Sequence, residues 1–142
     1  MLAKAFNIVA VLAGVVRSSP RPQGKYCGIT VGYNMKINFT DDKLLDLSFH
    51  YTGTGTQANC THEPNTFQAW GDSQKMSLPK MEDDSDCLGL NLRRHAEFDD
   101  GFFTYDAAQN ALMMHHDQVT SELNSASCDS VAAAPSLPQG KY

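Results

Sequence analysis

Apolar and polar residues alternate along much of this chain, as they do in a β-strand that buries one face. The clearest case is residues 45–51, where single polar residues separate four apolar ones, Leu45, Leu47, Phe49 and Tyr51. The same period predicts strands over residues 27–33, 35–40, 66–70, 75–78, 87–92, 102–105 and 111–114. Residues 118–128 stay open between a strand and a short helix, because Val119 and Leu123 have helical spacing in a serine-rich segment.

Short polar segments separate the predicted strands. Residues 41–43, 71–73 and 106–110 have the composition of turns, and two longer segments, 52–57 and 81–86, predict exposed loops. The predicted fold class is all-β, a small antiparallel barrel or sandwich of about seven to nine strands with two disulfides. The aromatic residues of these strands, Trp70 and Phe102 among them, are expected in its core.

The first 18 residues have a different pattern. Lys4 gives a short positive start, and residues 5–16 are apolar apart from Asn7, which is the layout of a secretory signal peptide. A membrane-spanning helix needs about 20 apolar residues, more than this segment contains. We therefore expect a signal peptide at 1–18, a disulfide-stapled β-domain at 19–128, and a secreted, extracellular protein that does not insert into membranes.

Residues 129–142 shift in composition toward alanine, proline and serine, which is typical of a linker. They include Pro138-Gln139-Gly140-Lys141-Tyr142, which is identical to Pro22-Gln23-Gly24-Lys25-Tyr26. Because repeated segments mark repeated units, we interpret residues 129–142 as a linker followed by the start of a second repeat. The alternative is a coincidental match in a tail.

Four cysteines follow the predicted signal peptide: Cys27, Cys60, Cys87 and Cys128. An even number in a small secreted chain indicates two disulfides. We favour Cys27–Cys128, which would tie the first strand to the last, and Cys60–Cys87, which would clamp the middle of the chain. Interlaced pairings stay open. The wide spacing does not suit a zinc site, and neither a metal nor a cofactor is predicted.

Charge narrows the range of partners. Removing residues 1–18 takes away Lys4 and Arg17 and no acidic residue, so the formal charge moves from −5 to −7, with 9 basic and 16 acidic residues. Such a surface repels phosphate backbones, which excludes nucleic acid as an expected partner. Two Asn-x-Thr sequences predict N-glycosylation at Asn38 and Asn59; the second is the weaker because Cys60, inside it, is expected in a disulfide.

The sequence contains no assembled catalytic motif. Both the Gly-x-Ser-x-Gly elbow and the glycine-rich phosphate loop are missing. The carboxylates Asp46, Glu63 and Asp99 leave a secreted hydrolase as an alternative, if they pair in space. His115 and His116 are adjacent, so on a strand they point to opposite faces and cannot bind one metal together. The favoured function is a secreted non-catalytic binding module, and a tandem-module structural or coat protein is the other alternative.

Two segments are the candidate binding loops. One is the glycine loop Thr52, Gly53, Thr54, Gly55, Thr56 and Gln57, and the other contains the acidic residues Asp83, Asp84 and Asp86. Since Cys60 follows one loop and Cys87 the other, a disulfide between them is expected to gather both loops at one end. An extracellular protein or glycan would bind there, because binding residues concentrate on loops that a rigid scaffold holds.

The segment Gly24-Lys25-Tyr26-Cys27-Gly28 begins the first predicted strand. It resembles the Gly-x-Trp motif of the calycin barrels (lipocalins, fatty-acid-binding proteins and avidins), with Tyr26 in place of the tryptophan. The resemblance covers these few residues and the all-β pattern. It implies a barrel that the aromatic residue plugs at one end and that admits a small apolar ligand at the other.

Overall fold

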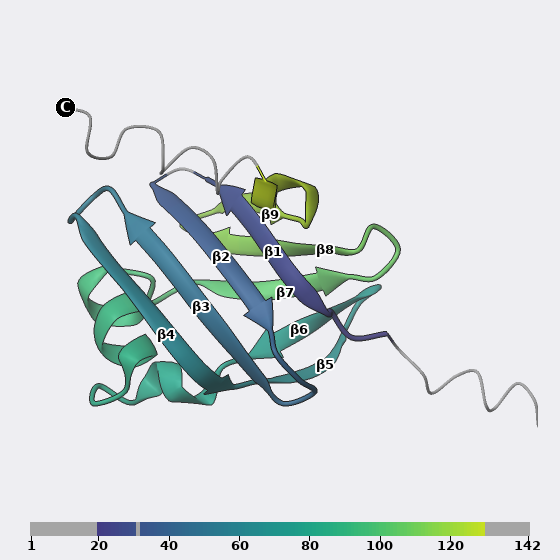
Figure 1. The fold of residues 1–142 in the computed structure, drawn as a ribbon, viewed down its shortest axis with the longest axis horizontal. Coiled ribbons are helices and arrows are strands. Elements are labelled where there is room, and N and C mark those ends of the chain that lie inside the picture. Colours follow the sequence, from purple (N-terminus) through teal and green to yellow (C-terminus); the bar gives the residue numbers. More distant parts are fainter. Residues whose placement is uncertain (1–19, 31, 130–142) are drawn as a thin grey trace, which may run out of the picture.

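The computed structural model describes residues 20–30 and 32–129, and it confirms the all-β prediction (Figure 1). The first sheet contains, in spatial order, β1 (Gly24–Ile29), β2 (Tyr33–Phe39), β3 (Leu44–Tyr51) and β4 (Thr56–Pro64). The second contains β5 (Thr66–Trp70), β6 (Ser73–Ser77), β7 (Phe102–Asp106), β8 (Ala111–His116) and β9 (Val119–Leu123). All neighbours are antiparallel, and the sheets do not close into a barrel, so the fold is a sandwich. The predicted signal peptide and residues 138–142 lie outside the described residues.

The chain changes sheets at one residue, Asn65, between β4 and β5. Asn65 is buried, and both its backbone N–H and its Nδ2 donate to the carbonyl of Lys43, at 3.0 and 3.2 Å. Its Oδ1 accepts a hydrogen bond from Arg21 at 3.4 Å. These bonds satisfy the polar groups that a buried corner would otherwise leave unpaired.

The core lies between the two sheets and follows the predicted alternation. In β2 and β3 every second residue is buried, among them Ile37 and Leu47. The largest side chains less than 2 % exposed come from both sheets and the connections: Tyr26, Tyr33, Met35, Ile37, Leu45, Leu47, Leu88, Leu92, Phe98, Phe103, Leu112 and Leu123. Each such side chain contributes about 1.5–3 kcal/mol of burial free energy. The space between the sheets is therefore filled with side chains.

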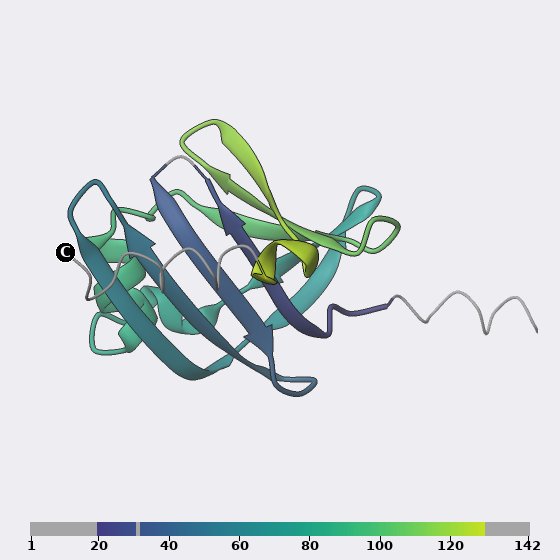
Figure 2. The same cartoon turned by 45° about the horizontal axis from the view of Figure 1, so that its top comes forward.

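Both predicted disulfides are confirmed. Cys27–Cys128 joins β1 to a short helical turn after β9, which lies beside β1 in Figure 2. Next to it, Cys27 and Asn124 exchange two backbone hydrogen bonds of 3.0 Å, which link β1 to the end of β9. Cys60–Cys87 joins β4 to the first helical residue of the next segment. Two disulfides indicate an extracellular or otherwise oxidising environment.

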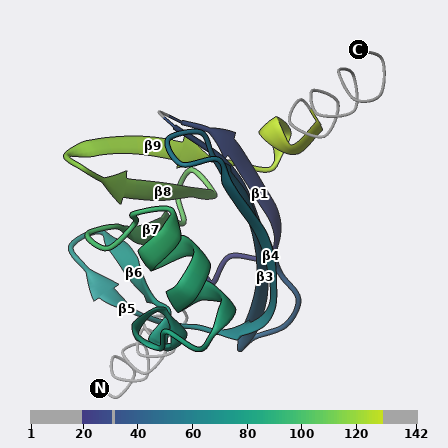
Figure 3. The same cartoon turned by 90° about the vertical axis from the view of Figure 1, so that its left-hand side faces the viewer.

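The predicted strand over residues 87–92 is wrong. This segment forms the helix η2 (Leu88–His95), which follows a single turn, η1 (Pro79–Glu82), and lies beside β4 (Figure 3). The buried residues Leu88, Leu92 and Ala96 are four apart, a spacing that fits one face of a helix. The spacing of two between Leu88, Leu90 and Leu92 fits a strand equally well. Tertiary packing decided between the two periods. Among the described residues no helix is both long enough and apolar enough to cross a membrane.

Three other boundaries differ from the prediction. The strand predicted over 27–33 is interrupted by a turn at Gly32, whose φ of +87° favours glycine. Strand β4 was not predicted, and it already begins at Thr56, within the predicted loop 52–57. Its alternation is weak because the inward residues Ala58 and Cys60 are small, and a bulge at His62 breaks the register. The ambiguous segment 118–128 contains both β9 and a helical turn.

Candidate functional site

The glycine loop is held by its own hydroxyl groups. Thr54 and Thr56 both donate to the carbonyl of His95 at the end of η2, at 3.0 and 3.3 Å. The backbone N–H of Thr52 donates to the carbonyl of Gly32 at 2.8 Å. The threonine hydroxyls of this loop are thus engaged within the fold.

A small pocket of about 170 Å³ lies beside this loop. Thr52 and Gly53 line it together with Tyr51, His116 and Asp117, from the β3–β4 and β8–β9 connections and the ends of β3 and β8. Ligand pockets usually have about 300–1,000 Å³. This pocket has room for a few water molecules or one small side chain.

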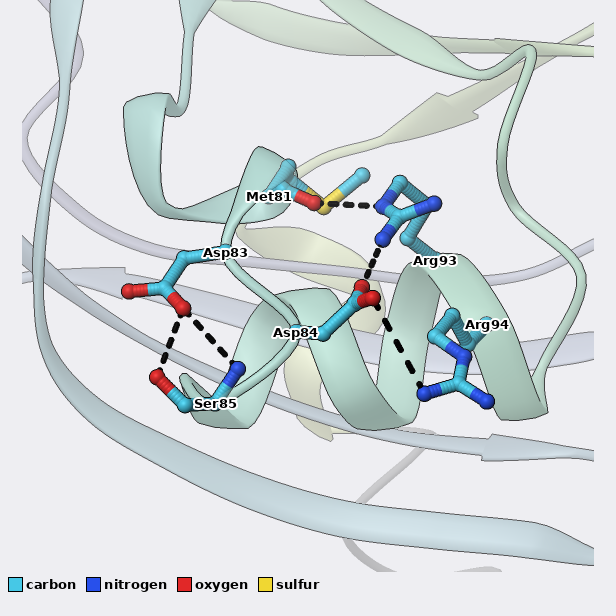
Figure 4. Close-up of polar contacts among 6 residues, drawn as sticks. All are labelled: Met81, Asp83, Asp84, Ser85, Arg93 and Arg94. Atoms are coloured by element: carbon cyan, nitrogen blue, oxygen red, sulfur yellow. Dashed lines mark hydrogen bonds and ion pairs between the residues drawn. The ribbon is translucent and has the colours of Figure 1, made fainter.

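The acidic loop is also committed to internal contacts (Figure 4). Oδ1 of Asp83 accepts hydrogen bonds from the backbone N–H and the hydroxyl of Ser85, at 2.9 and 2.6 Å, and these bonds lower the pKa of Asp83. Oδ2 of Asp86 accepts the N–H of Leu88 at 3.1 Å, which satisfies one free donor at the start of η2. Both carboxylates shape the turn into η2.

The third acid of the loop, Asp84, faces the basic residues of η2. It forms an ion pair with Arg93, and Arg94 lies at 3.9 Å (Figure 4). Nε of Arg93 also donates to the carbonyl of Met81, at 2.6 Å. The loop is thereby fastened along one side of η2.

The structure does not bring the two predicted binding loops together. The acidic residues lie before the first turn of η2, next to the Cys60–Cys87 disulfide, whereas Thr54 and Thr56 contact its last residue, His95. A helix of this length separates its two ends by about 10 Å. A single binding surface made of both loops has no support in this arrangement.

The three carboxylates considered for hydrolysis also lie apart. Asp46 is on the outward face of β3, where it accepts the N–H of His62 at 2.9 Å. Glu63 lies opposite Leu45, on the inward side, and is 3 % exposed. Asp99 is exposed in the turn before β7. No two of them share a cleft.

Glu63 has a different acidic neighbour, Asp86. Burial and the hydrogen bond and charge of Asp86 raise the pKa of Glu63 to about 7. One of its oxygens, Oε1, is buried with no hydrogen-bond partner. A carboxyl in such a place favours its neutral, protonated form, so it couples the stability of the fold to pH.

The two predicted glycosylation sites share one face. Asn38 in β2 and Asn59 in β4 both point outward from the first sheet, and Oδ1 of Asn59 accepts a hydrogen bond from Ser48 at 3.0 Å. Apart from Leu44, the other outward residues of the central strands are also polar: Asn34, Lys36, Asp46, Ser48 and His50. Both asparagines therefore lie on a mainly polar face, on which Ile29 of β1 is the exposed large apolar residue.

The outward face of the second sheet is aromatic. Phe102 and His115 are stacked, with ring centroids 4.5 Å apart, and Trp70 meets them edge-on at 5.6 and 5.9 Å. Nζ of Lys75 lies 4.5 Å from the centroid of Phe102. We call these four residues, Trp70, Lys75, Phe102 and His115, the aromatic patch. Trp70 is 44 % exposed.

Hydrogen bonds fix the aromatic patch. The two ring nitrogens of His115 lie 2.9 Å from the hydroxyl of Thr104 and 3.2 Å from that of Thr120. Burial and the charge of Lys75 lower the pKa of His115, which keeps its ring neutral at pH 7. Thr104 is only 2 % exposed although it faces outward beneath the patch. The ring of His115, on which Phe102 stacks, is thus held in place before any ligand binds.

The aromatic patch was missed because its residues were expected in the core. Phe102 and Phe103 are adjacent in one strand, so only one of them can point inward; Phe103 is buried in the core, and Phe102 is outside. Likewise His115 faces the patch, whereas His116 stacks on Phe98, which confirms that the two histidines point apart. Adjacent aromatic residues in a strand were the signal that could have revealed an outward ring.

No protein-family model matches the chain, and no curated protein or solved structure is significantly similar to it. Within residues 20–30 and 32–129, no three His, Cys, Asp or Glu side chains are grouped as a metal site requires. The surface chemistry of the two sheets therefore carries the functional conclusion.

Proposed function

We propose that this protein is a secreted, non-catalytic binding module that binds a glycan through the aromatic patch. The observation that carries the proposal is Trp70, a large exposed ring fixed against Phe102 and His115 on a rigid sheet. The disulfides and the predicted signal peptide support secretion.

The surroundings of Trp70 suit a sugar. Its indole ring has about the size of one sugar ring, whose C–H groups pack on aromatic faces while its hydroxyls form hydrogen bonds with polar side chains. The strand register places Gln68 and Ser73 on the same face as Trp70, next to Lys75. An amide, a hydroxyl and an ammonium thus surround the ring, and all of them can hydrogen-bond hydroxyls.

A broad protein interface has less support. Stable interfaces bury about 800 Å² on each partner around an apolar centre. The exposed large apolar residues in the described part of the chain are Ile29, Trp70 and Val119, and they lie on different faces. Ile29 is on the outward side of the first sheet, opposite Asn34, and Val119 pairs with the inward-facing His116. The patch has the extent of one or two sugar units.

A small apolar ligand, which the resemblance to calycin barrels implies, would need a hollow interior. Here the side chains of both sheets fill the space between them. Binding on the outward face is therefore the better-supported version of a binding module.

The test is a glycan array followed by calorimetric titration of the best-bound glycan. We expect Trp70→Ala to weaken binding at least tenfold, which corresponds to about 1.4 kcal/mol, with the fold unchanged. The matched control is Ile29→Ala, which removes an exposed apolar side chain from the other sheet and should leave binding unchanged. Glycan binding that survives Trp70→Ala would overturn the proposal.

A further inference from the structure

Strand β5 forms an open sheet edge (Figure 3). Of the four edges of the sandwich, those of β1 and β9 are linked through Cys27 and Asn124, and that of β4 lies beside η2. Within residues 20–30 and 32–129, strand β5 pairs with β6 alone. Its sequence, Thr-Phe-Gln-Ala-Trp, contains none of the charged residues or prolines that usually protect an edge from pairing with another strand.

The register shows which backbone groups are free. Trp70 and Ser73 close a two-residue turn, and such a turn ends in a pair whose backbone groups face each other. Along an antiparallel ladder this orientation alternates. The N–H and C=O groups of Trp70, Gln68 and Thr66 therefore face β6, and those of Phe67 and Ala69 face away from the sheet. These four groups are available to another strand.

We propose that β5 pairs with β5 of a second copy of this chain, antiparallel and about a two-fold axis at Gln68. Phe67 of each copy then lies opposite Ala69 of the other, and their free backbone groups form four hydrogen bonds. The two five-stranded sheets become one continuous sheet. This interface depends on backbone pairing rather than on a broad apolar patch, and it is independent of the proposed glycan function.

The sizes of the side chains on β5 favour a second copy of this chain as the partner that pairs with this strand. On the inward side, the pairing sets a large residue, Phe67, against a small one, Ala69, at both symmetric positions. The two residues line a groove of about 370 Å³ together with Pro20 and Tyr105, and strand β5 of the second copy would lie along this groove. On the outward side, the same register sets Trp70 of each copy opposite Thr66 of the other. Aromatic rings opposite β-branched residues are stabilising cross-strand pairs.

Charge complementarity also favours a second copy. Continuing the same register places Asp72, in the turn after β5, beside Pro64 and Asn65 of the other copy. Arg21 lies there, with its guanidinium 3.4 Å from Oδ1 of Asn65 and 4.9 Å from the ring centroid of Phe67. In the two-fold dimer, Asp72 of each copy therefore lies near Arg21 of the other copy, so the contact forms twice. The pairing also leaves both aromatic patches on the same side of the continuous sheet, so the dimer presents two equivalent sites.

The test is sedimentation equilibrium of the secreted, disulfide-bonded protein and its variants. We expect a concentration-dependent dimer. Gln68→Lys and Gln68→Glu should each weaken it at least tenfold, because like charges then lie directly opposite across the axis. An equimolar mixture of these two variants should restore the dimer. Gln57→Lys, an outward substitution on β4, is the matched control and should not change association.

A second variant tests the backbone pairing itself. Ala69→Pro removes an N–H that faces the open edge, which an edge strand tolerates without losing a bond to β6; it should abolish the dimer while thermal unfolding shows an intact fold. The proposal is wrong if the wild type stays monomeric at concentrations up to about 1 mM, where the binding free energy is only about 4 kcal/mol. It is also wrong if Ala69→Pro still forms the dimer, or if the mixture of Gln68→Lys and Gln68→Glu stays monomeric. Capture of a different polypeptide by a monomeric wild type would also overturn it. Monomeric Ala69→Pro that still binds the glycan separates this proposal from the proposed function.

Discussion

The outward faces of the two sheets differ more than any other two regions of this molecule. The first sheet presents mainly asparagine, lysine, serine and histidine, with both predicted glycosylation sites, Asn38 and Asn59, on that face. The second presents the aromatic patch, next to the unprotected edge of β5. Both sheets contribute inward side chains to the same core, so burial does not explain the contrast. The outward positions do not pack into the shared core, and they are where the two sheets diverge.

The largest effect should come from a charge that the first sheet buries. Glu63 is the one buried carboxylic acid among the described residues, and its pKa of about 7 exceeds the ordinary 4.5 of a glutamate. Between these two pH values the native state binds more protons than the unfolded state, so stability falls as pH rises from about 4.5 to 7. Glu63→Gln should remove this dependence and raise the free energy of unfolding at pH 8 by about 1–3 kcal/mol.

Urea denaturation at pH 5 and pH 8 measures this effect. Glu82→Gln, at an exposed position in η1, is the control and should leave the pH dependence as in the wild type. Equal stability of the wild type at pH 5 and pH 8 would show that ionising Glu63 costs the native state no free energy, which would contradict this prediction.

A smaller effect on stability is expected when the outward faces of the two sheets are compared by mutation. Phe102→Ala removes the ring between His115 and Lys75, and should lower the free energy of unfolding by about 1–2 kcal/mol, because aromatic and cation–π contacts go with it. Ser48→Ala, at an outward position in the centre of the first sheet, should stay within about 0.5 kcal/mol. Chemical denaturation of both variants gives the difference. Equal losses would mean that the aromatic patch contributes no more to folding than the polar face.

The smallest effect should come from the glycans themselves. Intact mass spectrometry of the secreted protein should find N-glycan at Asn38, and Asn38→Gln should remove it. Because the glycan extends from the first sheet, its loss should change glycan binding by the aromatic patch less than twofold and stability by less than about 0.5 kcal/mol. A large loss of binding in Asn38→Gln would place part of the binding surface on the first sheet.

The single sequence determined the features that depend on local period and on counting. Alternation predicted β2 and β3 with their inward residues, because a strand repeats every two residues whatever it pairs with. The even number of cysteines predicted two disulfides, and the expected neighbourhood of the first and last strands predicted Cys27–Cys128. The histidine pair was correctly expected to split between two faces for the same reason of period.

Tertiary structure decided the rest. Leu88, Leu90 and Leu92 fit a strand locally, and only the packing of Leu88 and Leu92 beside β4 selects the helix. Strand β4 depends on pairing with β3 across a bulge, which its small and polar residues do not signal. The register of strands distant in sequence decides which of the adjacent rings, Phe102 or Phe103, faces the core. It also decides which strand is left at an open edge of the sheet. Local patterns specify an element's period, but its neighbours and its exposed side arise only when the whole chain packs.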